Sequence, residues 1–157
     1  MILANKLIKH LKEKELTIAF AESVTCGLAT QKLSNFKGTS DVLKGSIICY
    51  TPEVKKGLLN ITNKCIKEFT CESKKVTDEL AKNLSGIIKA DLCAAITGLA
   101  SPGGSETINK PVGTIFLSVF FKGKIHHISR IIKGSPLQIR EKACLELYRF
   151  ILKLTSD

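Results

Sequence analysis

Apolar residues recur along this chain in two patterns, one at helical spacing and one in short continuous runs. Between Ile2 and Leu11 they recur at helical spacing, which predicts an amphipathic first helix. Three later runs have the length of a strand and are almost wholly apolar, as expected for strands covered on both faces of a sheet. These predicted strands are LTIAFA (16–21), GSIICYT (45–51) and ADLCAAITG (90–98). Between them we predict helices over 23–35, 53–59 and 76–90.

Capping residues predict where the later helices begin. Thr77 is followed by two acidic residues and is predicted to be the N-cap of the helix over 76–90. The segment SPLQ (135–138) combines a capping serine, a proline at the first helical position and a glutamine three residues after the cap. This capping box predicts a last helix that runs to about Leu154.

A hairpin completes the predicted architecture. Lys122-Gly123 separates two further apolar runs, 112–121 and 124–132, and predicts a tight antiparallel turn. The order of elements then predicts a three-layer α/β/α sandwich. Its mixed sheet is mostly parallel with one antiparallel strand. We expect a single domain over 1–157.

Composition excludes a membrane or secreted protein. Hydrophobic residues make up 44% and charged residues 24% of the chain, and no apolar run approaches the roughly 20 residues of a membrane span. Lysines interrupt the N-terminal segment, so it lacks the apolar region of a signal peptide. We therefore expect a soluble, cytoplasmic protein.

The cysteines and histidines give little basis for cross-links or metals. Most of the six cysteines lie in apolar stretches, and without an export signal we expect buried free thiols rather than disulfides. There is no CxxC pair and there are only three histidines, so no metal site is expected.

The formal charge of +10 favours binding of a negatively charged partner. The lysines are spread along the chain and no basic run alternates with aromatic residues, so a solvated surface is favoured over a nucleic-acid interface. A small phosphate-bearing ligand would need only two or three of these charges.

Candidate chemistry lies in the loops that follow the three buried strands, because ligands bind beyond the carboxyl ends of parallel strands. Ser23, after the first strand, could cap the next helix or act as a nucleophile. His126 and His127 have no evident orienting acid, so a Ser-His-Asp triad is disfavoured. Tyr50 and Lys55 share the loop after the second strand, and a buried lysine can serve as the base for a serine. From position alone, Lys55 could equally be an exposed charge and Tyr50 a packing residue.

The loop after the third strand, TGLASPGG (97–104), is rich in glycine. Its backbone could form a nest for a phosphate, but it matches neither a P-loop nor a dinucleotide fingerprint. An ordinary loop and a ligand site are both consistent with it.

Five motifs in order resemble those of one family. They are AESVTCG, GSIICYTPEVKKGLL, VTDELA, AAITGLASPGG and KPVGTIFLSV. Together they are similar to the CinA C-terminal domain family, the nicotinamide-nucleotide amidohydrolases, over almost the whole chain. The resemblance implies hydrolysis of the carboxamide of nicotinamide mononucleotide to nicotinate mononucleotide and ammonia, without a metal or organic cofactor. It also implies a homo-oligomer, a dimer or larger.

The resemblance carries over to individual positions. It implies that Ser23 is the nucleophile and that Tyr50 and Lys55 are its catalytic partners, with helix-start N–H groups stabilising the oxyanion. Arg140 matches an arginine that we assign to the phosphate. The implied substrate-binding residues are Thr25, Gly27, Thr97, Gly98, Gly103, Gly104 and Arg140.

Several positions depart from the family pattern. Cys26 and Ser101 replace glycines, Pro52 replaces a common asparagine, and Ser135-Pro136 replaces an Asp-Arg pair. These departures leave open a homologue that binds a nucleotide-like ligand without turnover. The family's link to competence leaves open an accessory protein that associates with nucleic acid. The chain begins at the family domain's own first helix, so we do not expect the pyrophosphatase activity of the larger domain that often precedes it.

Overall fold

A five-stranded sheet forms the centre of the molecule. The computed structural model describes residues 2–156, so the ends of the domain expected over 1–157 lie outside it. The strand order is β2-β1-β3-β4-β5, and β1, β2 and β3 are parallel. β4 is antiparallel to both of its neighbours, so it is the one reversed strand, as predicted. The strands are β1 (Ile18–Glu22), β2 (Leu43–Ile48), β3 (Leu92–Gly98), β4 (Thr114–Phe121) and β5 (Lys124–Ile131).

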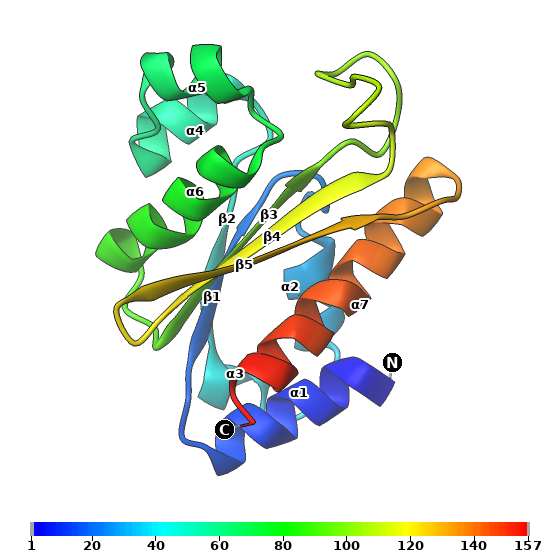
Figure 1. Cartoon of the computed structure of the whole chain (residues 1–157). Helices are drawn as coiled ribbons and strands as arrows, with labels where there is room; N and C mark the ends of the chain where they lie inside the picture. The colour runs from blue at the N-terminus through cyan, green and yellow to red at the C-terminus, as the bar shows by residue number, and fades with distance from the viewer. Residues whose placement is uncertain (1, 157) are drawn as a thin grey trace.

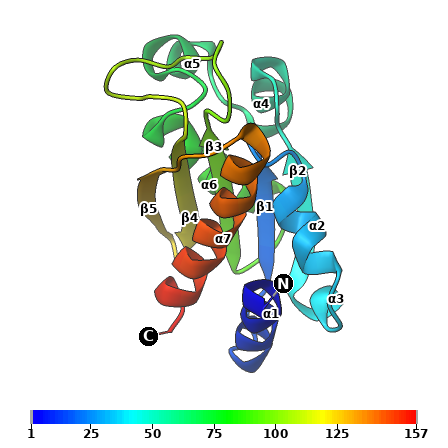
Figure 2. The same ribbon diagram turned by 90° about the vertical axis from the view of Figure 1, so that its right-hand side faces the viewer.

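Helices cover both faces of this sheet (Figures 1 and 2). One face carries α1 (Ile2–Glu13), α2 (Leu28–Ser34), α3 (Thr39–Val42) and α7 (Pro136–Leu154). The other carries α4 (Pro52–Leu59), α5 (Asn63–Phe69) and α6 (Lys74–Ile87). The predicted three-layer α/β/α sandwich is therefore confirmed.

The two faces of β1 explain why its sequence is an apolar run. Ile18 and Phe20 belong to the hydrophobic cluster under α1 and α7, whereas Ala19 and Ala21 belong to the cluster under α6. Both sets of side chains are removed from water, so no polar residue alternates with them. The small side chains on the α6 side let that helix approach the sheet closely.

The predicted turn and last helix are confirmed in detail. Lys122 and Gly123 have φ values of 49° and 75°, as a type I′ hairpin turn requires. At the start of α7, Ser135 and Gln138 form the reciprocal hydrogen bonds of a capping box.

Two predicted helix starts are wrong. Ser73 rather than Thr77 caps α6, because its Oγ accepts a hydrogen bond from the Val76 N–H and the helix begins at Lys74. Thr77 lies inside the helix, where its hydroxyl donates to the Ser73 carbonyl. The helix predicted over 23–35 begins only at Leu28, and the residues before it form turns. The short helices α3 and α5 were not predicted.

The six cysteines are free thiols, as expected. Cys49, Cys65, Cys93 and Cys144 are buried, and burial raises the pKa of the Cys49 thiol to about 11. Cys26 is exposed and Cys71 is half-buried, so the expectation of burial is wrong for Cys26.

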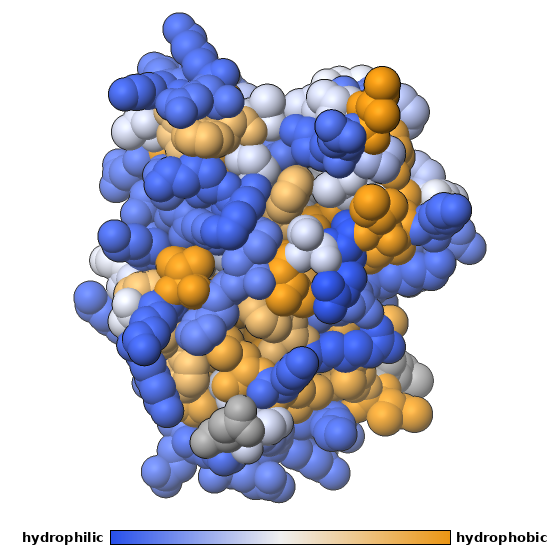
Figure 3. All heavy atoms as spheres, in the orientation of Figure 1, coloured by the Kyte–Doolittle hydropathy of each residue, from blue (hydrophilic) through white to orange (hydrophobic). Residues whose placement is uncertain are grey.

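The face of the molecule in Figure 3 is mainly hydrophilic. On the face shown in Figure 3, hydrophilic side chains predominate and hydrophobic ones gather in separate patches between them. Within residues 2–156, no helix is both long enough and apolar enough to cross a membrane.

Candidate functional site

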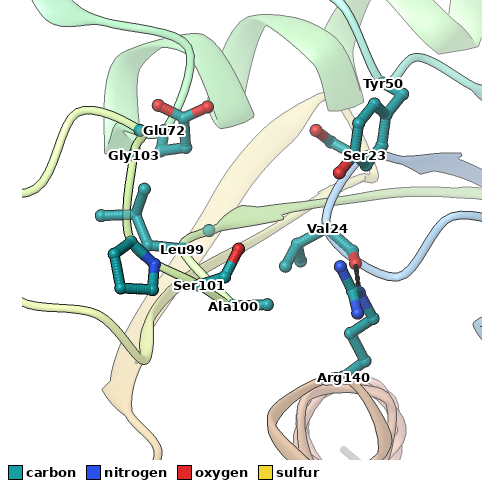
Figure 4. Close-up of a pocket in the computed structure, with 12 residues that line it drawn as sticks. Ser23, Val24, Tyr50, Glu72, Leu99, Ala100, Ser101, Gly103 and Arg140 are labelled. Atoms are coloured by element: carbon teal, nitrogen blue, oxygen red, sulfur yellow. Dashed lines mark hydrogen bonds between the residues drawn. The ribbon is translucent and has the colours of Figure 1, made fainter. Parts of the chain in front are cut away.

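A pocket of about 190 Å³ opens beyond the carboxyl ends of the parallel strands. This is where the topology places ligands in open α/β sheets. Figure 4 shows the side chains around it. Its lining comprises Ser23, Val24, Tyr50, Glu72, residues 98–104 and Arg140. The loops after β1, β2 and β3, in which the candidate chemistry was expected, all contribute residues to this cavity.

Ser23 and Lys55 are in direct contact at this pocket. Ser23 follows β1, and its Oγ lies 3.1 Å from the Lys55 Nζ. Lys55 lies in α4 and is completely buried, so the interpretation of an exposed charge is wrong. Its Nζ also donates to the carbonyls of Cys49, at 2.7 Å, and Tyr50, at 3.2 Å. These three contacts fix the terminal nitrogen beside the serine oxygen.

The hydroxyl of Ser23 does not cap α2. Gly27 is the N-cap residue, and it has no side chain to hydrogen-bond the helix start. The capping role that position alone allowed for Ser23 is therefore absent. Ser23 is held instead by its backbone N–H, which donates to the Ile96 carbonyl at 3.0 Å.

A residue that the sequence did not single out, Glu22, organises the turn after Ser23. Its carboxylate is fully buried and accepts hydrogen bonds from the backbone N–H groups of Gly27, Ala29 and Thr30, at 2.9–3.0 Å. It also accepts from the hydroxyls of Thr25, at 2.7 Å, and Thr30, at 2.6 Å. In the sequence, the only signal for this role was the position of an acidic residue at the end of an apolar strand. Glu22 thus does for α2 what a capping side chain does elsewhere.

Two predicted substrate-binding residues belong to this turn rather than to the pocket lining. Thr25 is buried and donates to Glu22. Gly27 has φ +93°, and a Cβ there would lie 3.1 Å from the Ile48 Cδ1. Both residues shape the loop that carries Ser23. Cys26 is exposed and is not among the residues that line the cavity.

The glycine-rich loop is at the pocket, with one exception. Gly98, Gly103 and Gly104 line the cavity, whereas Thr97 is buried and its hydroxyl bonds that of Thr77 at 2.7 Å. Thr97 therefore ties β3 to α6 and is not among the residues that line the cavity.

Of the two possibilities left open for this loop, an ordinary loop or an anion nest, two N–H groups form a nest, which holds a carboxylate of the chain itself. The N–H groups of Gly103 and Gly104 donate to the two oxygens of Glu106, at 2.7 and 2.8 Å. The Gly103 hydrogen bond is the main cause of the lowered pKa of Glu106. These N–H groups can hold an anion, and an incoming phosphate would have to replace Glu106.

Two charged side chains line the cavity, among the residues that the structure describes. Arg140 comes from α7, and its Nε donates to the Val24 carbonyl at 3.0 Å. Glu72 lies in the turn between α5 and α6 and was not predicted, because nothing in the local sequence points to a distant loop. The Ser105 hydroxyl donates to the Glu72 Oε2 at 2.5 Å.

His127 has an acidic neighbour, contrary to expectation, but the arrangement is not a triad. Its Nδ1 lies 3.0 Å from the Ser118 Oγ and 3.3 Å from the Asp78 Oδ1, while Ser118 also donates to Asp78 at 2.6 Å. The same ring nitrogen faces both partners, so the ring cannot relay a proton from serine to carboxylate. Burial alone would raise the pKa of Asp78, but hydrogen bonds from His127, Lys74 and Ser118 lower it to about 2.

Metal-binding side chains are not grouped in residues 2–156. No three His, Cys, Asp or Glu residues of this range lie together in a way that could hold a metal ion. The chemistry available at the pocket is that of a buried Ser-Lys pair with a half-exposed tyrosine beside it.

Comparisons by sequence point to one family. A sequence model of the CinA C-terminal domain matches residues 1–155. A CinA-like protein of Pseudothermotoga lettingae is 39% identical over 118 residues, which make up 74% of this chain and 29% of that protein. A CinA-like protein of Prochlorococcus marinus (strain MIT 9215) is 37% identical over 162 residues, covering 98% of this chain and 38% of that protein. The chain therefore spans well under half the length of these curated relatives.

Solved structures share the fold. The competence/damage inducible protein CihA from Agrobacterium tumefaciens has a TM-score of 0.92 at 25% identity, over 99% of this chain and 94% of that one. A competence or damage-inducible protein from Enterobacter asburiae has a TM-score of 0.92 at 25% identity, over 98% and 96% of the two chains.

Proposed function

Because the chain belongs to the CinA C-terminal domain family, we propose that it hydrolyses the carboxamide of nicotinamide mononucleotide. The products are nicotinate mononucleotide and ammonia. The observation that carries the proposal is the 3.1 Å contact between the Ser23 Oγ and the buried Lys55 Nζ at the edge of the pocket. A serine with a lysine as its base is an established solution for acyl transfer.

In the proposed first step, the Ser23 Oγ attacks the amide carbon. Lys55 acts as the base in its neutral form and takes the serine proton. Its two N–H groups keep donating hydrogen bonds to the carbonyls of Cys49 and Tyr50. The C–N bond then breaks, and the departing nitrogen receives a proton from Lys55, directly or through the Tyr50 hydroxyl. Water then attacks the resulting ester while Lys55 takes a proton from it, and Lys55 gives this proton to the Ser23 Oγ as the ester C–O bond breaks.

The oxyanion donors must differ from those that the sequence suggested. The N–H groups of Gly27, Ala29 and Thr30 at the start of α2 already donate to Glu22, so they are not available to a substrate. We assign the oxyanion to the backbone N–H group of Val24, which directly follows the serine and lines the pocket. This donor would stabilise the negative charge that develops on the carbonyl oxygen.

The phosphate of the substrate is assigned to Arg140 and to the glycine-rich loop, which line the same cavity as Ser23. Arg140 supplies a fixed guanidinium, and the N–H groups of Gly103 and Gly104 supply a nest once Glu106 moves away. No metal or organic cofactor takes part in the proposal. The expected homo-oligomeric state and cytoplasmic location belong to the same proposal, and light scattering of the purified chain tests the former.

Ammonia release from nicotinamide mononucleotide tests the proposal. Wild-type protein should release ammonia, whereas Ser23→Ala and Lys55→Ala should lose at least about a thousandfold in rate, as expected when nucleophile or base is removed. Lys56→Ala is the matched control, because it removes the neighbouring lysine, which makes no contact with Ser23. No release at high wild-type concentration would refute the amidase, and activity in Ser23→Ala would refute only the assignment of the serine.

Binding of the mononucleotide without turnover is a second candidate. The observation in its favour is that the N–H groups at the start of α2 already donate to Glu22. They therefore cannot stabilise the transition state. Calorimetric binding of the mononucleotide without ammonia release would establish it. A salt-sensitive shift with DNA, together with no binding of the mononucleotide, would instead support association with nucleic acid.

A further inference from the structure

We propose that Glu72 is the specificity-determining residue of the pocket and that it selects ligands whose ring carries a positive charge. The proposal rests on the proposed function, since the pyridinium ring of nicotinamide mononucleotide is such a ring. It adds a residue to the site that neither the motifs nor the Ser-Lys contact indicated.

The charges around the cavity support this assignment. Among the described residues of the lining, Glu72 and Arg140 are the two that bear a charge, and the charges are opposite. They come from opposite layers, Glu72 from the turn before α6 and Arg140 from α7, and Figure 4 shows them on different sides of the space beside Ser23. A ligand with separated positive and negative groups matches such a cavity better than a simple anion does.

Glu72 is held in place but is not fully occupied. The Ser105 hydroxyl donates to its Oε2, and the Lys110 Nζ donates to its backbone carbonyl at 3.0 Å. Lys110 also donates to the hydroxyls of Thr70 and Ser105, at 2.8 Å each. In the described part of the chain, hydrogen bonds to the Glu72 carboxylate involve Oε2 alone, which leaves Oε1 for a ligand.

This scaffold also connects Glu72 to the glycine-rich loop. Ser105 follows Gly104 directly, so the side chain that orients the carboxylate belongs to the segment that would bind the phosphate. A fixed carboxylate favours a cation over a neutral ring by electrostatic attraction, without reorganising when the ligand binds.

The test compares two ligands that differ in ring charge. Oxidised nicotinamide mononucleotide has a cationic ring, and its reduced form has a neutral ring with the same carboxamide and phosphate. Calorimetry with the Ser23→Ala protein, which prevents turnover, gives the ratio of the two dissociation constants. We expect the oxidised ligand to bind about tenfold more tightly, and Glu72→Gln to bring the ratio to within about twofold of one.

Controls separate charge from structure. Glu72→Asp keeps the charge and should keep a preference for the oxidised ligand. Ser105→Ala removes the hydrogen bond that orients the carboxylate but keeps its charge, so it should lower the ratio only in part. Should Glu72→Gln fail to fold, the ratio in the Ser23→Ala protein should still fall as salt is raised, because the phosphate contribution is common to both ligands.

The outcomes distinguish this inference from the proposed function. Binding of both ligands with a ratio that neither Glu72→Gln nor salt changes would overturn the role of Glu72 and leave the amidase intact. Failure of both ligands to bind, together with no ammonia release by wild type, would overturn the two proposals together.

Discussion

The buried carboxylate of Glu22 provides the sharpest structural prediction. It accepts hydrogen bonds from three backbone N–H groups and from the hydroxyls of Thr25, Thr30 and Ser46, and so connects the end of β1 to the start of α2. Glu22→Gln keeps the shape of the side chain but replaces one oxygen with an NH₂ group. A carboxylate accepts on both oxygens, whereas a glutamine amide accepts on one.

The geometry sets the size of the effect. Gly27 and Ala29 donate their N–H groups to Oε2, and Thr30 donates its N–H to Oε1. The best placement for glutamine keeps its oxygen on the Oε2 side, so the Thr30 N–H loses its acceptor while the Thr30 hydroxyl can rotate to accept. An unsatisfied buried donor costs about 1–3 kcal/mol, and the remaining bonds lose their charge assistance. We expect Glu22→Gln to lower the free energy of unfolding by about 2–4 kcal/mol.

Urea unfolding followed by circular dichroism measures this change. Glu13→Gln is the matched control, since Glu13 is exposed at the end of α1, and its effect should stay within about 0.5 kcal/mol. If Glu22→Gln does not fold, Thr30→Val removes one of the hydroxyl donors and should cost about 1 kcal/mol. A loss below about 1 kcal/mol for Glu22→Gln would refute the idea that this carboxylate holds the turn.

Three further predictions concern other contacts. The pKa of Asp78 is lowered to about 2, so its ionised carboxylate should stabilise the fold by about 2 kcal/mol above pH 4. This contribution should disappear as the pH falls toward 2. Asp78→Asn should flatten the pH dependence of urea unfolding over that range, and an unchanged slope would contradict the assignment. Glu106→Ala should tighten binding of inorganic phosphate by about threefold or more in calorimetry, because the two N–H groups are freed; weaker binding would contradict this. Gly98→Ala should lower the free energy of unfolding by about 2 kcal/mol, because its Cβ would lie 2.6 Å from the Thr114 carbonyl oxygen. A Cβ at Gly57 meets nothing within 4 Å, so Gly57→Ala should be neutral or stabilising. Equal effects of the two substitutions in thermal unfolding would contradict the close contact at Gly98.

Much of the fold could be predicted because its signals are local. The apolar runs of β1 and β3, the turn at Lys122-Gly123 and the capping box at Ser135 each act within a few residues. The start of α2 could not be placed, because the carboxylate of Glu22 reaches forward to N–H groups up to Thr30 and holds a turn where the pattern indicated helix.

The site was predicted in part for a similar reason. Ser23 and Lys55 follow from the resemblance, but the burial of Lys55 cannot be recognised beside the adjacent Lys56, since only the packing of α4 distinguishes the two. Glu72 could not be found, because the pocket includes it through a turn far along the chain from Ser23. Thr97 was assigned to the ligand although β3 directs its hydroxyl toward Thr77 and α6.

The most direct test of the account is whether an acyl group passes through Ser23. Nicotinamide mononucleotide is incubated with the enzyme and hydroxylamine, a nucleophile that competes with water for a covalent ester. The account predicts that wild-type protein forms the hydroxamate of nicotinate mononucleotide alongside nicotinate mononucleotide, and that Ser23→Ala forms neither. Ammonia release by wild type without any hydroxamate, or hydroxamate formed by Ser23→Ala, would contradict the central claim.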